Sequence, residues 1–157
     1  MKQGWTGLVA APHTPFTADG ALDVSVVPAQ MEHLVSDGVA GAFVCGSTGE
    51  GPSMTVAERM ALAEAWMRHR PRGFPVMVHV GTASLPDSVA LARHAEAIGA
   101  DAVATLPPFY FKPSGIEALL AWCRPVADAA GKLPFLYYHL PALSGVDVSM
   151  TATADAA

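Results

Sequence analysis

Positive charge is scarce in this chain of 157 residues, which has nine lysine and arginine residues in all and a net charge of −5 at pH 7. A surface that binds nucleic acid needs clustered basic side chains, and these nine are scattered along the sequence. No stretch reaches the roughly 18–20 unbroken apolar residues that a membrane-spanning helix needs. We therefore expect neither nucleic acid nor a membrane as a partner.

Cysteine is also scarce, because the chain has only Cys45 and Cys123. Their wide separation fits neither a metal site nor a redox motif. The six histidines include no i, i+4 pair that would place two ligands on one helix face. The N-terminus lacks the charged segment and long apolar run of a secretory signal. These absences predict a cytoplasmic protein with two free thiols, no metal and no cofactor.

The composition is that of one domain, which we place over residues 1–157. Hydrophobic residues make up 52% of the chain and charged residues 15%, a balance typical of a chain with a well-buried core. The length is close to the commonest size of a single domain.

A helix-start signal, Ser or Thr followed three residues later by Asp or Glu, recurs at intervals of about 30 residues. It occurs at Thr55, Ser84 and Ser114. Apolar runs of strand length precede the three signals, and they are continuous rather than alternating, as in strands buried on both faces. The predicted strands are residues 7–12, 39–45, 75–80, 101–106 and 135–140, with a further helix over residues 25–36.

The alternation of strands and helices predicts an α/β protein with parallel strands. Repeats of this kind occur in open doubly wound sheets and in (β/α)8 TIM barrels. A complete barrel takes about 250 residues, so the chain would supply only its N-terminal portion, with about five strands and four helices. Residues 151–157 have no apolar periodicity, which predicts an unstructured or non-native tail.

Residues 46–50 (Gly-Ser-Thr-Gly-Glu) directly follow the second predicted strand. The hydroxyls of Ser47 and Thr48 and nearby backbone amides could hold a small carboxylate or phosphate there. Gly46 and Gly49 would allow a backbone conformation that turns the amides toward a ligand. The alternative is that the hydroxyls only cap the turn or the following helix.

Two tyrosines could serve such a site. Alternation along the fifth predicted strand places Tyr137 and Tyr138 on opposite sides, so one of them can face the interior of a barrel. A phenol at a strand end can relay protons, although a buried tyrosine is ordinarily part of a core. Tyr110 lies in an aromatic loop that could instead pack under the rim of the barrel or against another subunit.

Three segments in this order resemble the N-acetylneuraminate lyase and dihydrodipicolinate synthase family of class I aldolases. They are residues 46–50, residues 107–110 (Pro-Pro-Phe-Tyr) and residues 138–145 (Tyr-His-Leu-Pro-Ala-Leu-Ser-Gly). The likeness extends over residues 7–148. It implies a (β/α)8 barrel in which a lysine on the sixth strand forms a Schiff base with pyruvate or a pyruvate-derived part of the substrate.

The resemblance also implies roles for individual residues. Ser47 and Thr48, flanked by Gly46 and Gly49, would hold the pyruvate carboxylate. Tyr138 would pass protons to and from the reacting carbonyl and hydroxyl groups. Tyr110 would reach across a tight dimer into the neighbouring site, within a homo-oligomer that is a dimer of dimers.

Within the family, the chain resembles the lyase branch. The synthase branch usually reads Gly-Thr-Thr-Gly-Glu, and it has an arginine where Leu143 stands here. That arginine holds the carboxylate of a second substrate, a contact that leucine cannot make. The resemblance favours cleavage of a sialic acid or related sugar acid, with synthase-like or sugar-acid dehydratase activity as alternatives.

The Schiff-base lysine is absent from this sequence. The chain has three lysines, Lys2, Lys112 and Lys132, and none lies in a predicted strand. The expected lysine would follow about one strand-and-helix unit after Tyr138, and the chain ends first. A second hypothesis is therefore a catalytically inactive fragment that binds small carboxylates or pairs with full-length subunits. A third is a flavodoxin-like open sheet with an anion site at Ser47 and Thr48.

Overall fold

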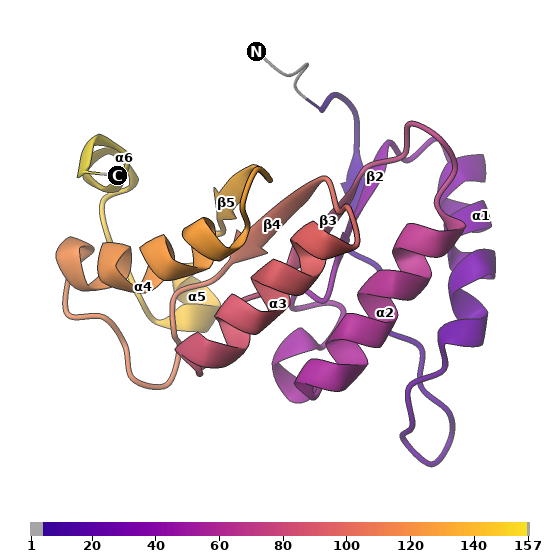
Figure 1. Ribbon diagram of the computed structural model, residues 1–157, viewed down its shortest axis with the longest axis horizontal. Coiled ribbons are helices and arrows are strands. Elements are labelled where there is room, and N and C mark those ends of the chain that lie inside the picture. The colour runs from indigo at the N-terminus through magenta and orange to yellow at the C-terminus, as the bar shows by residue number, and fades with distance from the viewer. Residues whose placement is uncertain (1–4, 157) are drawn as a thin grey trace.

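Five short parallel strands alternate with helices in the computed structural model, which describes residues 5–156 (Figure 1). The strands are β1 (Val9–Ala10), β2 (Gly41–Val44), β3 (Val76–His79), β4 (Ala102–Thr105) and β5 (Phe135–Tyr137). The helices are η1 (Val24–Val26), α1 (Val27–Ser36), η2 (Gly51–Ser53), α2 (Val56–His69), α3 (Leu85–Ala97), α4 (Ile116–Ala129), α5 (Pro141–Ser144) and α6 (Met150–Ala156).

The strand order distinguishes the two α/β architectures that the sequence left open. Each strand pairs with the next one along the chain, in the order β1-β2-β3-β4-β5. A flavodoxin-like sheet would have the order 2-1-3-4-5, so that hypothesis is wrong. Helices α1 to α4 contact one another in sequence and form one layer against the sheet (Figure 1). This arrangement confirms the prediction of a barrel portion.

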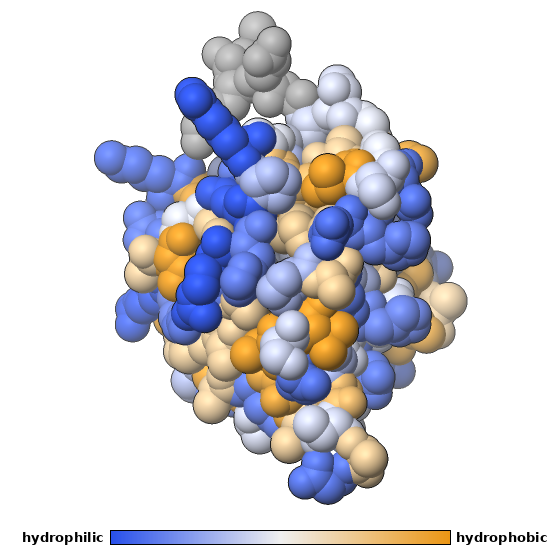
Figure 2. All heavy atoms as spheres, turned by 90° about the vertical axis from the view of Figure 1, so that its right-hand side faces the viewer, coloured by the Kyte–Doolittle hydropathy of each residue, from blue (hydrophilic) through white to orange (hydrophobic). Residues whose placement is uncertain are grey.

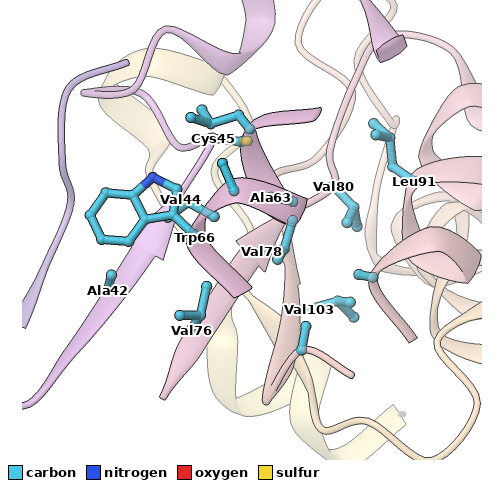
Figure 3. Close-up of a cluster of buried hydrophobic side chains, with 14 of the residues drawn as sticks. Ala42, Val44, Cys45, Ala63, Trp66, Val76, Val78, Val80, Leu91 and Val103 are labelled. Atoms are coloured by element: carbon cyan, nitrogen blue, oxygen red, sulfur yellow. The ribbon is translucent and has the colours of Figure 1, made fainter. Parts of the chain in front are cut away.

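One face of the sheet packs against the helices. Val44 lies opposite Val78 in the β2–β3 register. Both are buried in one apolar cluster with Trp66 of α2 and Leu91 of α3 (Figure 3). Side chains alternate along a strand, so Phe43 of β2 points away from the helix layer. The strands are thus buried toward the helices and carry the candidate site on the other face.

Two of the three predicted helix starts are confirmed. Thr55 accepts a hydrogen bond from the Glu58 amide at 3.2 Å, and the Glu58 carboxylate accepts one from the Thr55 amide at 2.8 Å. Ser84 accepts a hydrogen bond from the Asp87 amide at the start of α3. The start predicted at Ser114 is wrong by one residue, because the extended backbone of Gly115 provides the N-cap of α4 without a side-chain bond.

The segment after β5 differs from its prediction. Residues 150–156 form α6, so the first alternative for residues 151–157, an unstructured tail, is wrong for residues 151–156. The second alternative, a non-native tail, stays a prediction, and residue 157 lies outside the described part. The Ser149 hydroxyl accepts a hydrogen bond from the Ala152 amide at 3.4 Å, and α6 packs on α4. A serine cap followed by small residues forms a helix here without an apolar stripe.

The surface beside α1 mixes hydrophilic side chains with small hydrophobic patches (Figure 2). Val26 and Val35 are among its partly exposed apolar residues. Between residues 5 and 156, none of the helices has both the length and the hydropathy needed to cross a membrane.

Candidate functional site

The chain leaves the sheet sharply at the carboxyl end of β2. Cys45 has a left-handed backbone with φ of 60°, and Glu50 has a φ of 54°. The Glu50 amide donates to the Ser47 carbonyl oxygen at 3.1 Å, and the Gly51 amide donates to the Gly46 carbonyl oxygen at 3.1 Å. Residues 46–50, which we call the 46–50 turn, therefore fold into a tight loop above the end of the strand.

Gly46 and Gly49 of the 46–50 turn lie where neighbouring atoms come too close for a side chain to fit. A Cβ on Gly46 would lie 2.7 Å from Cε1 of Phe43, and a Cβ on Gly49 would lie 3.1 Å from the Pro12 carbonyl oxygen. The left-handed conformations fall on Cys45 and Glu50 instead. Neither glycine has a positive φ, and what both positions require is the absence of a side chain. The expectation that they let the amides turn toward a ligand stays a prediction.

The polar groups of the turn are free to meet a ligand. Ser47 and Thr48 are exposed, and neither hydroxyl makes a hydrogen bond with any described residue. The amides of Ser47, Thr48 and Gly49 likewise donate to no acceptor within residues 5–156. Helix α2 is capped by Thr55, so the hydroxyls do not serve as its caps. Two hydroxyls and three consecutive amides form a donor set suited to a small carboxylate.

The buried Thr14, which follows β1, fixes the turn from below. Its hydroxyl donates to the Gly49 carbonyl oxygen at 2.5 Å. That bond orients the peptide between Gly49 and Glu50.

Tyr138 lies near the 46–50 turn, because both are close to Phe43. Its ring packs edge-on against Phe43 with centroids 5.7 Å apart, and Phe43 also lies beneath Gly46. The Tyr138 amide donates to the Thr105 carbonyl oxygen at 2.8 Å, which ties this residue to β4. Tyr138 as a residue is 39% exposed.

Tyr137 takes the opposite side of β5, which confirms the predicted alternation. Its hydroxyl is buried with no hydrogen-bond partner among the described residues. Burial raises the pKa of Tyr137 to about 12. The phenol therefore stays protonated over the ordinary pH range and belongs to the packing rather than to the site.

Tyr110 is not brought to the other candidate residues. Its side chain is 76% exposed and packs edge-on against Phe111, with ring centroids 4.9 Å apart. Phe111 is also exposed. The role expected for Tyr110 in a neighbouring site stays a prediction.

A hollow of about 260 Å³ adjoins the turn. Leu143 of α5 and Ser47 both line this hollow. Leu143, whose position distinguishes the lyase branch from the synthase branch, therefore faces the same space as the candidate carboxylate site. The lining residues are Ser47, Glu50, Pro52, Ser53, Leu106, Phe109, Leu143 and Ser144.

The described lysines do not lie where the expected nucleophile would stand. Lys112 and Lys132 are exposed and lie outside the strands, and Lys112 packs over Gly145. Lys2 lies outside the described residues. Between residues 5 and 156, no three His, Cys, Asp or Glu side chains converge as a metal site would require.

Two buried polar residues lie below the turn: Arg59 of α2, which sequence reasoning missed, and His79 of β3, to which it assigned no role. Arg59 is 2% exposed and His79 is 1% exposed. Burial, and next the nearby Arg59 charge, lower the pKa of His79 to about 3, so its ring is neutral. The available signal was an arginine spaced three and seven residues before Leu62 and Trp66, on the apolar face of the predicted helix.

A family profile and curated proteins both match this chain over nearly its whole length. A profile described as the dihydrodipicolinate synthetase family matches residues 4–155. The N-acetylneuraminate lyase of Danio rerio is 47% identical over 143 residues, which are 90% of this chain and 47% of that protein. The N-acetylneuraminate lyase of Homo sapiens is 44% identical over 149 residues, which are 94% of this chain and 47% of that protein. The chain thus spans about half the length of the curated relatives it matches.

Solved structures are similar over the same extent. An N-acetylneuraminate lyase (sialic acid aldolase) from Aliivibrio salmonicida superposes with a TM-score of 0.93 at 38% identity, covering 98% of this chain and 51% of that one. YagE, a dihydrodipicolinic acid synthase family protein of E. coli K12 solved in complex with pyruvate, superposes with a TM-score of 0.87 at 32% identity. The match covers 97% of this chain and 51% of that one. The fold therefore matches the N-terminal half of these barrels.

Proposed function

This chain belongs to the dihydrodipicolinate synthetase family, and we propose that it provides the carboxylate-binding half of a pyruvate-dependent lyase of the N-acetylneuraminate lyase type. The proposed reaction cleaves a sialic acid or a related sugar acid to pyruvate and an aldehyde sugar. Its similarity within the family to N-acetylneuraminate lyases supports this choice of reaction.

One observation carries the proposal. The unpaired hydroxyls and amides of the 46–50 turn stand at the carboxyl end of β2, where parallel α/β barrels bind their ligands. The phenol of Tyr138 shares Phe43 with that turn, so a carboxylate donor set and a proton-transfer group lie on one platform. A 2-oxo acid needs both, since its carboxylate must be held while the neighbouring carbonyl oxygen exchanges protons.

The proposed roles follow from this arrangement. Ser47 and Thr48 hold the carboxylate by hydroxyl and amide donors, and Gly46 and Gly49 keep the turn close to Phe43 and Pro12. Tyr138 passes a proton to and from the reacting oxygen. In the proposed enzyme a lysine amine condenses with the 2-oxo carbon and releases water, and the resulting iminium accepts the electron pair of the breaking carbon–carbon bond.

Leu143 supports the lyase branch over the synthase branch. It lies in the same hollow as Ser47 and offers an isobutyl group where a second carboxylate would need a cation. The hollow therefore favours a substrate whose only carboxylate is the one held by the turn.

A non-catalytic protein that binds small carboxylates is the second candidate. It is favoured by the positions of Lys112 and Lys132, which are exposed and outside the strands. Neither lysine lies on a strand, where the family resemblance places the nucleophile, so neither is a suitable one. Such a protein would bind pyruvate through the turn without forming a Schiff base.

The proposed enzyme acts as a homo-oligomer in the cytoplasm. The exposed pair Tyr110 and Phe111 supports an interface, because two neighbouring aromatic side chains at 76% and 84% exposure are apolar surface available to a second subunit. The free, buried thiols of Cys45 and Cys123 support a reducing compartment.

Titration of the ¹⁵N-labelled 157-residue chain with pyruvate tests the proposed site. We expect the amide resonances of Ser47, Thr48 and Gly49 to shift together and to saturate. Acetone, which keeps the carbonyl but lacks the carboxylate, is the matched control and should leave them in place. Pyruvate-induced shifts confined to other segments would contradict the proposal.

A further inference from the structure

The carboxyl end of β3 has two carbonyl groups that β2 does not pair. The Val80 amide donates to the Ala104 carbonyl oxygen of β4 at 2.7 Å. Successive residues of a strand direct their backbone groups to opposite sides, so the carbonyls of His79 and Gly81 point toward β2. Strand β2 has already ended at Val44, because the chain turns away at Cys45. The departure of the 46–50 turn therefore leaves a gap in the sheet.

The guanidinium of Arg59 fills that gap. Its Nη1 donates to the Gly81 carbonyl oxygen at 3.0 Å, and its Nη2 donates to the His79 carbonyl oxygen at 2.5 Å. A planar, forked cation can span two such acceptors, which a lysine ammonium cannot do in the same way. Arg59 from α2 thus takes the place of the missing strand.

Burying the Arg59 guanidinium costs stability, so we asked which part of the structure depends on its position. Arg59 is buried and forms no salt bridge with a carboxylate among the described residues. Its Nε has no hydrogen-bond partner within the same part of the chain. The guanidinium makes its hydrogen bonds to carbonyl oxygens, and the more distant Asp87 carboxylate offsets only part of the cost of burying the charge.

His79 extends the contact from Arg59 toward the site. Its Nε2 accepts a hydrogen bond from the Leu106 amide at 3.2 Å, so the proton of the neutral ring is on Nδ1. Nδ1 lies 3.4 Å from Nη2 of Arg59, a packing contact rather than a hydrogen bond, because both nitrogens then carry hydrogen. The ring centroid is 5.9 Å from that of Phe43, the residue that lies under Gly46 and against Tyr138.

Cys45, the residue just before the turn, is held from the same side. The Cys45 thiol lies 3.8 Å from the Arg59 carbonyl oxygen, at hydrogen-bond distance for sulfur. Gly51 packs so closely on Cys45 that any Cβ there would overlap the Cys45 carbonyl oxygen. The left-handed backbone of Cys45 is therefore clamped between the first turn of α2 and the start of η2.

We propose that Arg59 and His79 are positioning residues for the 46–50 turn and for Tyr138. Arg59 closes the gap in the sheet that lets the turn leave β2, and His79 transmits that fixed position through Phe43 to the turn and the phenol. The proposal rests on the proposed function, because it assumes that the turn binds a small 2-oxo carboxylate.

The test compares two arginines of one helix. Arg59→Lys keeps the positive charge but cannot span both carbonyls, and Arg68→Lys makes the same change at an exposed position of α2. We expect Arg59→Lys to weaken pyruvate binding about tenfold while the resonances of α3 and α4 stay in place. Arg68→Lys should bind within about twofold of the unaltered chain.

A second variant follows the contact to Tyr138. His79→Gln can still accept from the Leu106 amide but removes the ring from Phe43. The chain has three tyrosines, so ¹³C-labelled tyrosine gives a resolvable set that Tyr110→Phe and Tyr137→Phe assign. We expect His79→Gln to shift the Tyr138 ring resonance and to weaken pyruvate binding, effects that a loss of stability alone would not produce in a folded variant.

The outcomes separate the two proposals. If the unaltered chain does not bind pyruvate at the turn, the proposed function is wrong. If it binds, and the folded Arg59→Lys and His79→Gln variants bind equally well, the positioning role is wrong and the proposed function stands. If Arg59→Lys does not fold, His79→Gln decides. If neither variant folds, the pair supports the whole domain and the positioning role is overturned.

Discussion

Replacing Ser47 with alanine should impair ligand binding and leave stability unchanged. The Ser47 hydroxyl is exposed and makes no hydrogen bond with a described residue, so its removal takes nothing from the folded chain. We expect the free energy of unfolding to change by less than about 0.5 kcal/mol.

The loss of affinity can be estimated from the chemistry of the proposed contact. A hydrogen bond to a charged group contributes about 1.5–3 kcal/mol, and the exposed position of Ser47 favours the lower end of that range. Since about 1.4 kcal/mol corresponds to a factor of ten, Ser47→Ala should raise the Kd for pyruvate about tenfold.

Isothermal titration calorimetry with pyruvate, paired with urea denaturation, measures both quantities. Ser53→Ala is the matched control, because Ser53 is exposed and lines the same hollow but lies outside the 46–50 turn. Ser53→Ala should change neither the Kd for pyruvate nor the free energy of unfolding. A Ser47→Ala variant that binds pyruvate as tightly as the unaltered chain would refute the assignment of the turn.

Three further predictions concern the groups around the turn. Gly46→Ala should cost about 1–3 kcal/mol of stability in urea denaturation, because its Cβ would lie 2.7 Å from Phe43, whereas Gly115→Ala, which meets no atom within 4 Å, should cost less. The depressed pKa of His79, about 3 against 6.5, gives stability that is complete above pH 6.5 and is lost as the pH falls toward 3. His79→Gln should therefore flatten that part of the stability profile, and an unchanged slope would argue against a buried neutral imidazole. Borohydride reduction with pyruvate should add no mass to this chain, since Lys112 and Lys132 are exposed outside the strands. A stoichiometric adduct on either lysine would reverse that conclusion.

Local signals predicted most of the fold. The capping pairs at Thr55 and Ser84 and the continuous apolar runs depend on near neighbours, so they could be located from the sequence. The start of α4 moved from Ser114 to Gly115, because glycine can begin a helix without a side-chain bond. Helix α6 was missed because a serine cap and contact with α4 substitute for apolar periodicity.

The candidate site was only partly predictable. The hydroxyls of Ser47 and Thr48 could be recognised because they follow a strand, but the reason for Gly46 depends on the distant ring position of Phe43. Arg59 meets the carbonyls of His79 and Gly81 only after α2 has packed on β3, so no spacing in the sequence marks that contact. Alternation predicted that Tyr137 and Tyr138 lie on opposite sides of the strand, but not which of the two faces Phe43.

In the proposed site, the 46–50 turn holds the carboxylate of a 2-oxo acid next to Tyr138. A crystal structure of this chain with pyruvate would test this arrangement. We expect carboxylate oxygens within hydrogen-bond distance of Ser47 and Thr48, with the Tyr138 hydroxyl facing the ligand. Pyruvate bound elsewhere, or Tyr138 turned toward the helix layer, would contradict it.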